Sequence, residues 1–230
     1  MPNAAYLPAD SIVYQIPLVQ LPTYRGRRLI VRSDDPSELA CQLGADDLDN
    51  LAYVQLCSLP SDTDVLVHWA DGLGIELVLE TPSADFPRLY QYAKLLDNHP
   101  VRIGVPVETG FEKAVKLAAS LQFAVRLQFG QPTAALIEVL TRLQDDYLHR
   151  STVGQPIEYF HSLLLGLCHQ EPVSLWAILE EDPALVRYVD ERGAEHFPGR
   201  LTGANIDAEP ADFVAHWASG LLADGAECAK

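Results

Sequence analysis

Cysteine and basic residues are both scarce in this 230-residue sequence, and each scarcity excludes a class of protein. The four cysteines (Cys41, Cys57, Cys168 and Cys228) contain no C-x-x-C or C-x-x-x-C spacing, so the sequence has no recognisable metal or cluster motif. Sixteen lysines and arginines stand against 32 aspartates and glutamates, which gives a formal net charge of −16. Nucleic acid and anionic membrane surfaces are therefore unfavourable partners.

Long apolar runs are absent as well. No stretch approaches the roughly 18 consecutive apolar residues that a membrane-spanning helix needs. The first ten residues, MPNAAYLPAD, lack the basic flank and apolar core of a signal peptide. A composition of 48% hydrophobic and 21% charged residues is instead typical of a globular protein. We expect a cytoplasmic protein with reduced thiols.

Familiar nucleotide-binding and hydrolase motifs are also missing. The sequence contains no G-x-x-x-x-G-K-[ST], H-E-x-x-H or G-x-S-x-G pattern. Phosphate-binding-loop hydrolysis, zinc proteolysis of the H-E-x-x-H type and α/β-hydrolase chemistry are therefore not the leading expectations.

The N-terminal part of the sequence predicts a β-hairpin followed by a short helix. Residues 11–21 (SIVYQIPLVQL) and 29–32 (LIVR) are rich in β-branched and aromatic residues, with a proline- and glycine-containing loop between them. Pro17 indicates a sheet edge or a bulge, because proline cannot donate a ladder hydrogen bond. Residues 33–44 (SDDPSELACQLG) begin with helix-capping side chains and end in glycine, which predicts a short helix.

A strand–helix repeat begins at residue 53. Strand patterns start at Tyr53, Ile75, Val101 and Phe123, and each is followed by a helical pattern. Such alternation predicts parallel strands joined by right-handed crossovers. The compact repeats favour a (β/α) barrel, and because a complete barrel takes about 250 residues we expect an incomplete one. A doubly wound, flavodoxin-like sheet is the alternative.

The expected fold is therefore α/β, an incomplete parallel (β/α) barrel with an N-terminal β-hairpin and a C-terminal helical extension. Phe213, Trp217 and Leu221 share one face of the helix expected in the extension, which suits it to docking. The patterns divide the chain into three parts, namely residues 1–50 (hairpin and short helix), 51–190 (partial barrel) and 191–230 (extension).

Two carboxylates fall where a parallel barrel carries its functional groups, at the carboxyl ends of its strands. Glu80 and Glu108 end neighbouring predicted strands. Their proximity would raise the pKa of one of them and would suit the pair to acid–base catalysis, metal binding or holding a substrate amine. Alternatively, they face water or cap the next helix. Gln128, at the end of the following strand, is predicted as a binding residue at the same edge.

Arginines cluster near the N-terminus. Residues 1–33 carry a net charge of +3 from four arginines, while the rest of the chain carries −19. Arg25, Arg27 and Arg28 are predicted to bind an acidic peptide or protein partner, with the exposed edge of the hairpin adding backbone pairing. The alternative is a surface loop in which arginines happen to cluster.

Two longer regions carry a family resemblance. Residues 188–228 contain four features in order, namely an acid-to-glycine turn (Asp190–Gly193), a small-residue stretch (Gly203–Ile206), a helix around Trp217, and Cys228. Together with the strand–helix repeat of residues 53–180, this layout resembles the radical S-adenosylmethionine enzymes, in particular the peptide-modifying branch with a SPASM-type extension. In that comparison Cys228 matches the first cysteine of the extension.

The resemblance implies an iron–sulfur cluster that this sequence cannot bind. The family holds its cluster through C-x-x-x-C-x-x-C after the first barrel strand, and the matching segment here, CSLPSDTD, offers Cys57 alone. We therefore predict no cofactor. The resemblance then implies a cluster-less relative that serves as a peptide- or partner-binding subunit in ribosomal-peptide modification. The alternatives are a barrel enzyme that uses Glu80 and Glu108, with or without a metal ion, and a structural subunit of a hetero-complex.

Overall fold

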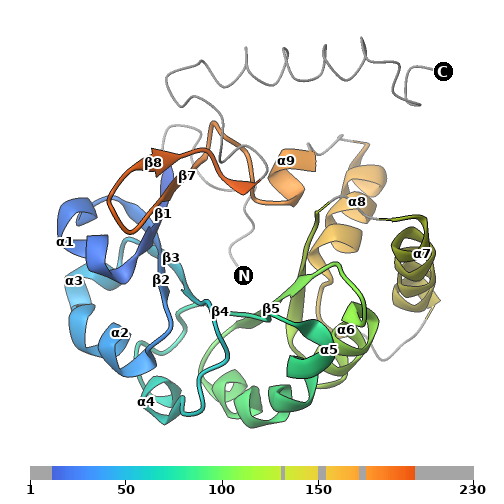
Figure 1. Ribbon diagram of the computed structural model, residues 1–230, viewed down its shortest axis with the longest axis horizontal. Helices are drawn as coiled ribbons and strands as arrows, with labels where there is room; N and C mark the ends of the chain where they lie inside the picture. Colours follow the sequence, from blue (N-terminus) through green and yellow to red (C-terminus); the bar gives the residue numbers. More distant parts are fainter. Residues whose placement is uncertain (1–11, 131–132, 150–153, 171–174, 200–230) are drawn as a thin grey trace.

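A computed structural model describes residues 12–130, 133–149, 154–170 and 175–199 (Figure 1). The strands are β1 (Val13–Pro17), β2 (Arg28–Ser33), β3 (Leu51–Leu56), β4 (Ile75–Val78), β5 (Val101–Pro106), β6 (Ala124–Gln128), β7 (Val186–Val189) and β8 (Glu195–His196). The helices are α1 (Leu21–Tyr24), α2 (Pro36–Gln42), α3 (Ala45–Leu48), α4 (Asp64–Val67), α5 (Pro82–Asp85), α6 (Phe111–Ser120), α7 (Ala134–His149), α8 (Glu158–His169) and α9 (Leu175–Ile178). Two segments are 3-10 helices, η2 (Leu18–Gln20) and η3 (Phe86–Asp97).

Within these residues, eight strands form one sheet in the order β6-β5-β4-β3-β2-β1-β7-β8. All neighbouring strands are parallel except β7 and β8, which are antiparallel. Consecutive strands from β1 to β6 lie side by side, without the reversal of strand order that marks a doubly wound sheet. Figure 1 shows the strands following an open arc, with α1 to α6 along its outer side. The predicted α/β class with a mainly parallel sheet is confirmed.

The predicted N-terminal hairpin is wrong. β1 and β2 run parallel, with Val13 opposite Arg28, so residues 18–27 form a crossover that contains η2 and α1. The segment read as a loop carries Leu18, Leu21 and Tyr24, and all three side chains are buried in the core. Burying these apolar side chains requires the connection to pack on the sheet, and a tight hairpin turn could not do so.

Strand β1 is also not an edge strand. It pairs with β2 on one side and with β7 on the other, so both of its edges are occupied. Pro17 is the last residue of β1, at the end of the ladder. The strand of the sequence repeat that begins near Tyr53 is β3, the third of the sheet in chain order, and not the first strand. The three-part division of the chain stays a prediction, and residues 200–230 of its third part lie outside the described residues.

The two faces of the sheet differ in polarity, because side chains along a strand alternate between its faces. One face packs on the outer helices and is apolar, and its fully buried residues include Val31, Val54, Leu77, Ile103 and Val125. The alternate positions on the same strands point to the inner face. Many of them carry polar or charged residues, among them Gln15, Arg32, Gln55, Glu76, Arg102 and Arg126. The fold therefore gathers polar side chains inside the curved sheet.

Candidate functional site

The register of the sheet places polar residues of four neighbouring strands side by side on the inner face. Arg32 of β2 lies opposite Gln55 of β3, Gln55 lies opposite Glu76 of β4, and Glu76 lies opposite Arg102 of β5. We call these four residues the polar row. Arg126 of β6 is opposite Gly104, which lies two residues beyond Arg102 along β5.

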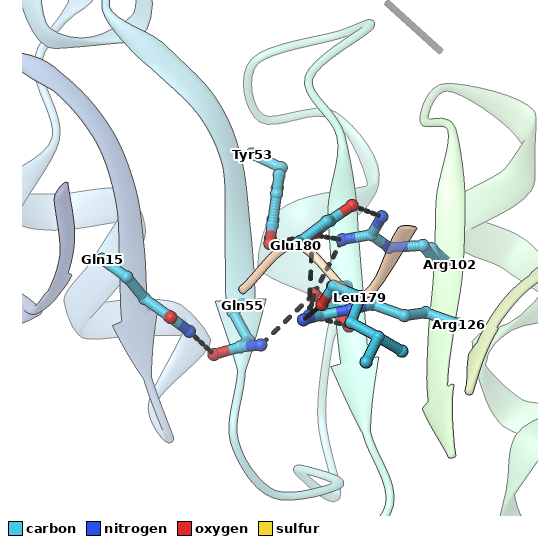
Figure 2. Close-up of polar contacts among 8 residues, drawn as sticks. Gln15, Tyr53, Gln55, Arg102, Arg126, Leu179 and Glu180 are labelled. Atoms are coloured by element: carbon cyan, nitrogen blue, oxygen red, sulfur yellow. Dashed lines mark hydrogen bonds and ion pairs between the residues drawn. The ribbon is translucent and has the colours of Figure 1, made fainter. Parts of the chain in front are cut away.

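Glu76 is the centre of a hydrogen-bonded cluster, and Figure 2 labels its partners Gln55, Arg102 and Arg126. Its carboxylate, only 1% exposed, accepts hydrogen bonds from Gln55 Nε2 at 3.2 Å, Arg102 Nη2 at 3.0 Å and Arg126 Nη1 at 3.3 Å. Gln15 Nε2 in turn donates to Gln55 Oε1 at 2.8 Å. A continuous set of hydrogen bonds therefore joins β1, β3, β4, β5 and β6 across the inner face.

Glu180, which follows α9, approaches the same two arginines from outside the sheet (Figure 2). Arg102 donates to it through both terminal nitrogens, Nη1 to Oε1 at 2.5 Å and Nη2 to Oε2 at 3.1 Å. The Tyr53 hydroxyl donates to Oε2 at 3.1 Å, and Arg126 Nη2 donates to the carbonyl of Leu179 at 3.0 Å. These contacts fix α9 over the inner face.

The charges of this cluster balance, since Glu76 and Glu180 face Arg102 and Arg126. Burial alone would raise the pKa of Glu180, but Arg102 and then Arg126 outweigh it and lower this pKa to about 2. Burial opposes the charge of both arginines, and the nearby carboxylates, Glu180 before Glu76, overcome it and raise their pKa values. Glu180 is thus held ionised at neutral pH, which makes it unsuitable as a general acid.

Gly104 allows the side chains of Glu76 and Gln128 to lie close to the backbone of β5. A Cβ atom at this position would lie 2.9 Å from both Gln128 Nε2 and Glu76 Oε1, closer than such atoms normally approach. The sheet therefore needs glycine here. The same contact places Gln128, the residue predicted at the end of the fourth repeat strand, beside the cluster and not at a separate site.

Arg32, at the other end of the polar row, has a different environment. Its guanidinium carbon lies 4.2 Å from the centre of the Tyr188 ring, and Nη2 donates to the Val189 carbonyl at 2.7 Å. Its Nε is buried and has no hydrogen-bond partner. Among the residues that the structure describes, no carboxylate forms an ion pair with Arg32. Arg32 therefore differs from Arg102 and Arg126, which are both paired with carboxylates.

Cys57 directly follows β3 and belongs to the same corner of the inner face. Burial raises the pKa of its thiol to about 11, although the positive charge of Arg32 acts to lower it. The thiol is therefore protonated at neutral pH and contributes no negative charge beside Arg32. Cys57 forms no disulfide, and the same holds for Cys41 and Cys168 among the described cysteines.

Glu80 and Glu108 are exposed and lie just beyond the carboxyl ends of β4 and β5. Within the described ranges, neither carboxylate forms a hydrogen bond or an ion pair. Both glutamates therefore lie at the carboxyl ends of the strands, as predicted, but outside the hydrogen-bonded cluster.

The predicted binding arginines lie at the opposite end of the strands, because they precede or begin β2. Arg25 forms an exposed ion pair with Asp47 at 3.2 Å. The guanidinium of Arg27 lies over two tyrosine rings, at 4.9 and 5.2 Å from their centres. Arg28 is half-buried and its Nε has no hydrogen-bond partner. The structure therefore does not join these arginines and the strand-end glutamates into one site.

The sequence analysis missed the cluster, although the strands carry a signal for it. A single polar residue recurs in six strands, between apolar residues in YQI, VQL, IEL, VRI and VRL and between valine and serine in VRS. In half-buried strands such residues share one face, so six successive occurrences predict a polar layer. Glu180 has no comparable signal, because it follows a short helix far along the chain.

Among the described residues, no group of three or more His, Cys, Asp or Glu side chains is placed to hold a metal ion. In the same part of the chain, no helix combines the length and the apolar composition that crossing a bilayer requires. Comparisons with protein-family models, with curated proteins and with solved structures found no match to this chain.

Proposed function

We propose that this chain is a binding subunit built on an incomplete (β/α) barrel, which takes up a peptide or protein partner at the carboxyl ends of its strands. The consecutive strand order and the outer helices support the barrel. Ile157 forms a parallel bridge with Val125 of β6, and β7 pairs with β1. These two segments take the places of a seventh and an eighth strand, and the barrel would be open between them.

The observation that carries the binding role is the contrast between the arginines of the inner face. Arg102 and Arg126 are neutralised within the chain, whereas Arg32 is held against Tyr188 and has no carboxylate partner among the described residues. The paired groups have little freedom to exchange protons during a reaction. The unpaired guanidinium lies near the end of its strand, where barrel proteins bind their ligands.

The proposed mode of binding differs from strand addition, since both edges of β1 are already paired. Recognition would instead use side chains at the carboxyl ends of the strands, with the partner and this chain forming a hetero-complex. The affiliation with the radical S-adenosylmethionine family remains a proposal that rests on the sequence resemblance. One part of this resemblance does not match the structure. The family's cysteine motif follows the first barrel strand, whereas Cys57 follows the third strand of this sheet. The connection after the first strand, residues 18–27, contains no cysteine.

A peptide-display selection tests this function. The purified full chain is offered random peptides displayed with free C-termini, and an equally acidic globular protein serves as the control target. We expect enrichment of peptides that bind the chain and lose binding after heat unfolding. Failure to enrich any peptide over the control target contradicts the proposal.

A second candidate is a barrel enzyme that uses Glu80 and Glu108. It is favoured by one observation, that both carboxylates are exposed beyond neighbouring strands at the same edge of the sheet. If this function is correct, the variants E80Q and E108Q will each abolish any turnover found by screening metabolite mixtures, while their thermal unfolding stays unchanged. Turnover that survives both substitutions excludes it.

A further inference from the structure

The charge balance of the chain makes the state of Arg32 unusual. Acidic residues outnumber basic ones two to one, 32 against 16, so a half-buried arginine would be expected to find a carboxylate within the chain. Its neighbours in the polar row follow that expectation, since Arg102 contacts both Glu76 and Glu180. Among the described residues, the partners of Arg32 are a backbone carbonyl and an aromatic ring.

The geometry around Arg32 holds its guanidinium in a fixed orientation. The guanidinium is held at two points, by its contact with the Tyr188 ring and by the hydrogen bond from Nη2 to the Val189 carbonyl. The Nε–H is buried without an acceptor, and leaving a buried donor unsatisfied carries a free-energy cost. An oriented guanidinium with unused donors is the arrangement that recognises a carboxylate through paired hydrogen bonds.

Within the part of the chain that the structure describes, no group supplies the missing negative charge. The thiol of Cys57 is protonated at neutral pH, as described above. The carboxylates of Asp34 and Glu191 act electrostatically on the same thiol, but both residues are exposed and neither forms an ion pair with Arg32. The described part of the chain therefore leaves the counter-ion of Arg32 to a ligand.

We propose that Arg32 and Tyr188 form a binding site for the carboxylate of a ligand, at the carboxyl end of β2 beside β7. The guanidinium would donate hydrogen bonds to the carboxylate oxygens while its face remains stacked on the Tyr188 ring. The source of this carboxylate rests on the proposed function, under which it would be the C-terminus of a bound peptide. A small free carboxylic acid offers the same chemistry.

Nuclear magnetic resonance of the arginine Nε–Hε groups tests the site in the full-length protein. Sodium acetate is titrated at constant ionic strength, with chloride as the anion that it replaces. We expect a saturable shift of the Arg32 Nε–Hε signal, and no saturable shift for the exposed control residue Arg142. An Arg32 signal that does not saturate, or that responds equally to chloride, overturns the proposal.

Variants and a peptide probe complete the experiment. R32K keeps the charge but removes the planar pair of donors, and we expect it to bind acetate about tenfold more weakly. R142K is the matched control and is expected to bind as the wild type does. Acetate affinity unchanged in R32K contradicts the site. The wild-type titration decides the question even if R32K fails to fold.

A short N-acetylated peptide with a free C-terminus is then compared with the same peptide amidated. A saturable shift of the Arg32 signal with the free acid alone supports both the site and the proposed peptide-binding function. A shift with acetate but with neither peptide supports the carboxylate site and argues against peptide binding. The two proposals therefore fail in distinguishable ways.

Discussion

Replacing Glu180 by glutamine removes the charge that connects α9 to the inner face, while it preserves the shape of the side chain. In the wild type, this carboxylate accepts three hydrogen bonds, two from Arg102 and one from Tyr53, and it lies 3.7 Å from Arg126 Nη1. In E180Q, Glu76 is the carboxylate that remains ion-paired with the two arginines. We therefore expect E180Q to fold with a markedly lower free energy of unfolding.

The size of this loss follows from the pKa of Glu180. A carboxyl group with an ordinary pKa of 4.5 and a folded-state pKa of about 2 contributes about 3 kcal/mol to stability at neutral pH. Removing one partner of a buried ion pair lowers the free energy of unfolding by a similar amount, about 3 to 5 kcal/mol. The side chain is 22% exposed, so the lower end of that range is expected.

The pH dependence has a definite sign. Because the folded-state pKa lies below the ordinary value, the contribution of Glu180 is complete above about pH 4.5 and disappears as the pH falls toward 2. The stability difference between wild type and E180Q should therefore shrink by more than half between about pH 6 and about pH 3.

Urea unfolding followed by circular dichroism measures this difference at each pH. E138Q, which neutralises an exposed glutamate on α7, is the control and is expected to change stability by less than about 0.5 kcal/mol. A loss below about 1 kcal/mol in E180Q at neutral pH would refute the reasoning, since a buried pair broken on one side costs more. A loss that is the same at acidic and neutral pH would refute it too.

Three further outcomes are expected. Gly104→Ala should lower the free energy of unfolding by about 1 to 3 kcal/mol in urea titrations, because its Cβ collides with side chains on both sides, whereas Gly130→Ala, with open space around it, should have a far smaller effect. At neutral pH, Cys57 should react with iodoacetamide much more slowly than the exposed Cys41 and Cys168, since burial raises its pKa to about 11; equal rates in site-resolved mass spectrometry would disprove this. Anaerobic reconstitution should leave the protein without stoichiometric iron and sulfide, because the sequence contains no set of closely spaced cysteines, and a brown protein with four irons per chain would contradict that expectation.

The sheet from β3 to β6 was predictable because its signals are local. Each of these strands is a short apolar run followed by a helical or turn pattern, and the repeat fixes parallel pairing in chain order. The β1–β2 connection was mispredicted because its proline and glycine residues are typical of a turn. The deciding information was Leu18, Leu21 and Tyr24, whose burial depends on contacts with the rest of the core.

The inner cluster was only half predictable. Its strand residues follow the period of two that the sequence displays, so a polar layer could have been inferred from Gln55, Glu76, Arg102 and Arg126. Which of these charges remain unpaired depends on Glu180, 78 residues beyond Arg102 in the chain, and no local pattern reports such a contact. The sequence could indicate a polar inner face but could not identify Arg32 as its unpaired member.

The arginines near the N-terminus show that charges close together in the sequence do not necessarily form a patch on the surface. Residues four apart in a strand lie about 13 Å apart, so β2 carries Arg28 and Arg32 to opposite ends of the sheet although they are neighbours in the sequence. Arg25 precedes the strand and is already paired with Asp47. The four arginines are therefore divided between the two ends of the strands. Of these arginines, Arg32 is the one at the carboxyl ends of the strands, where a parallel barrel binds its ligands. It is also the arginine of the polar row that has no carboxylate partner among the described residues.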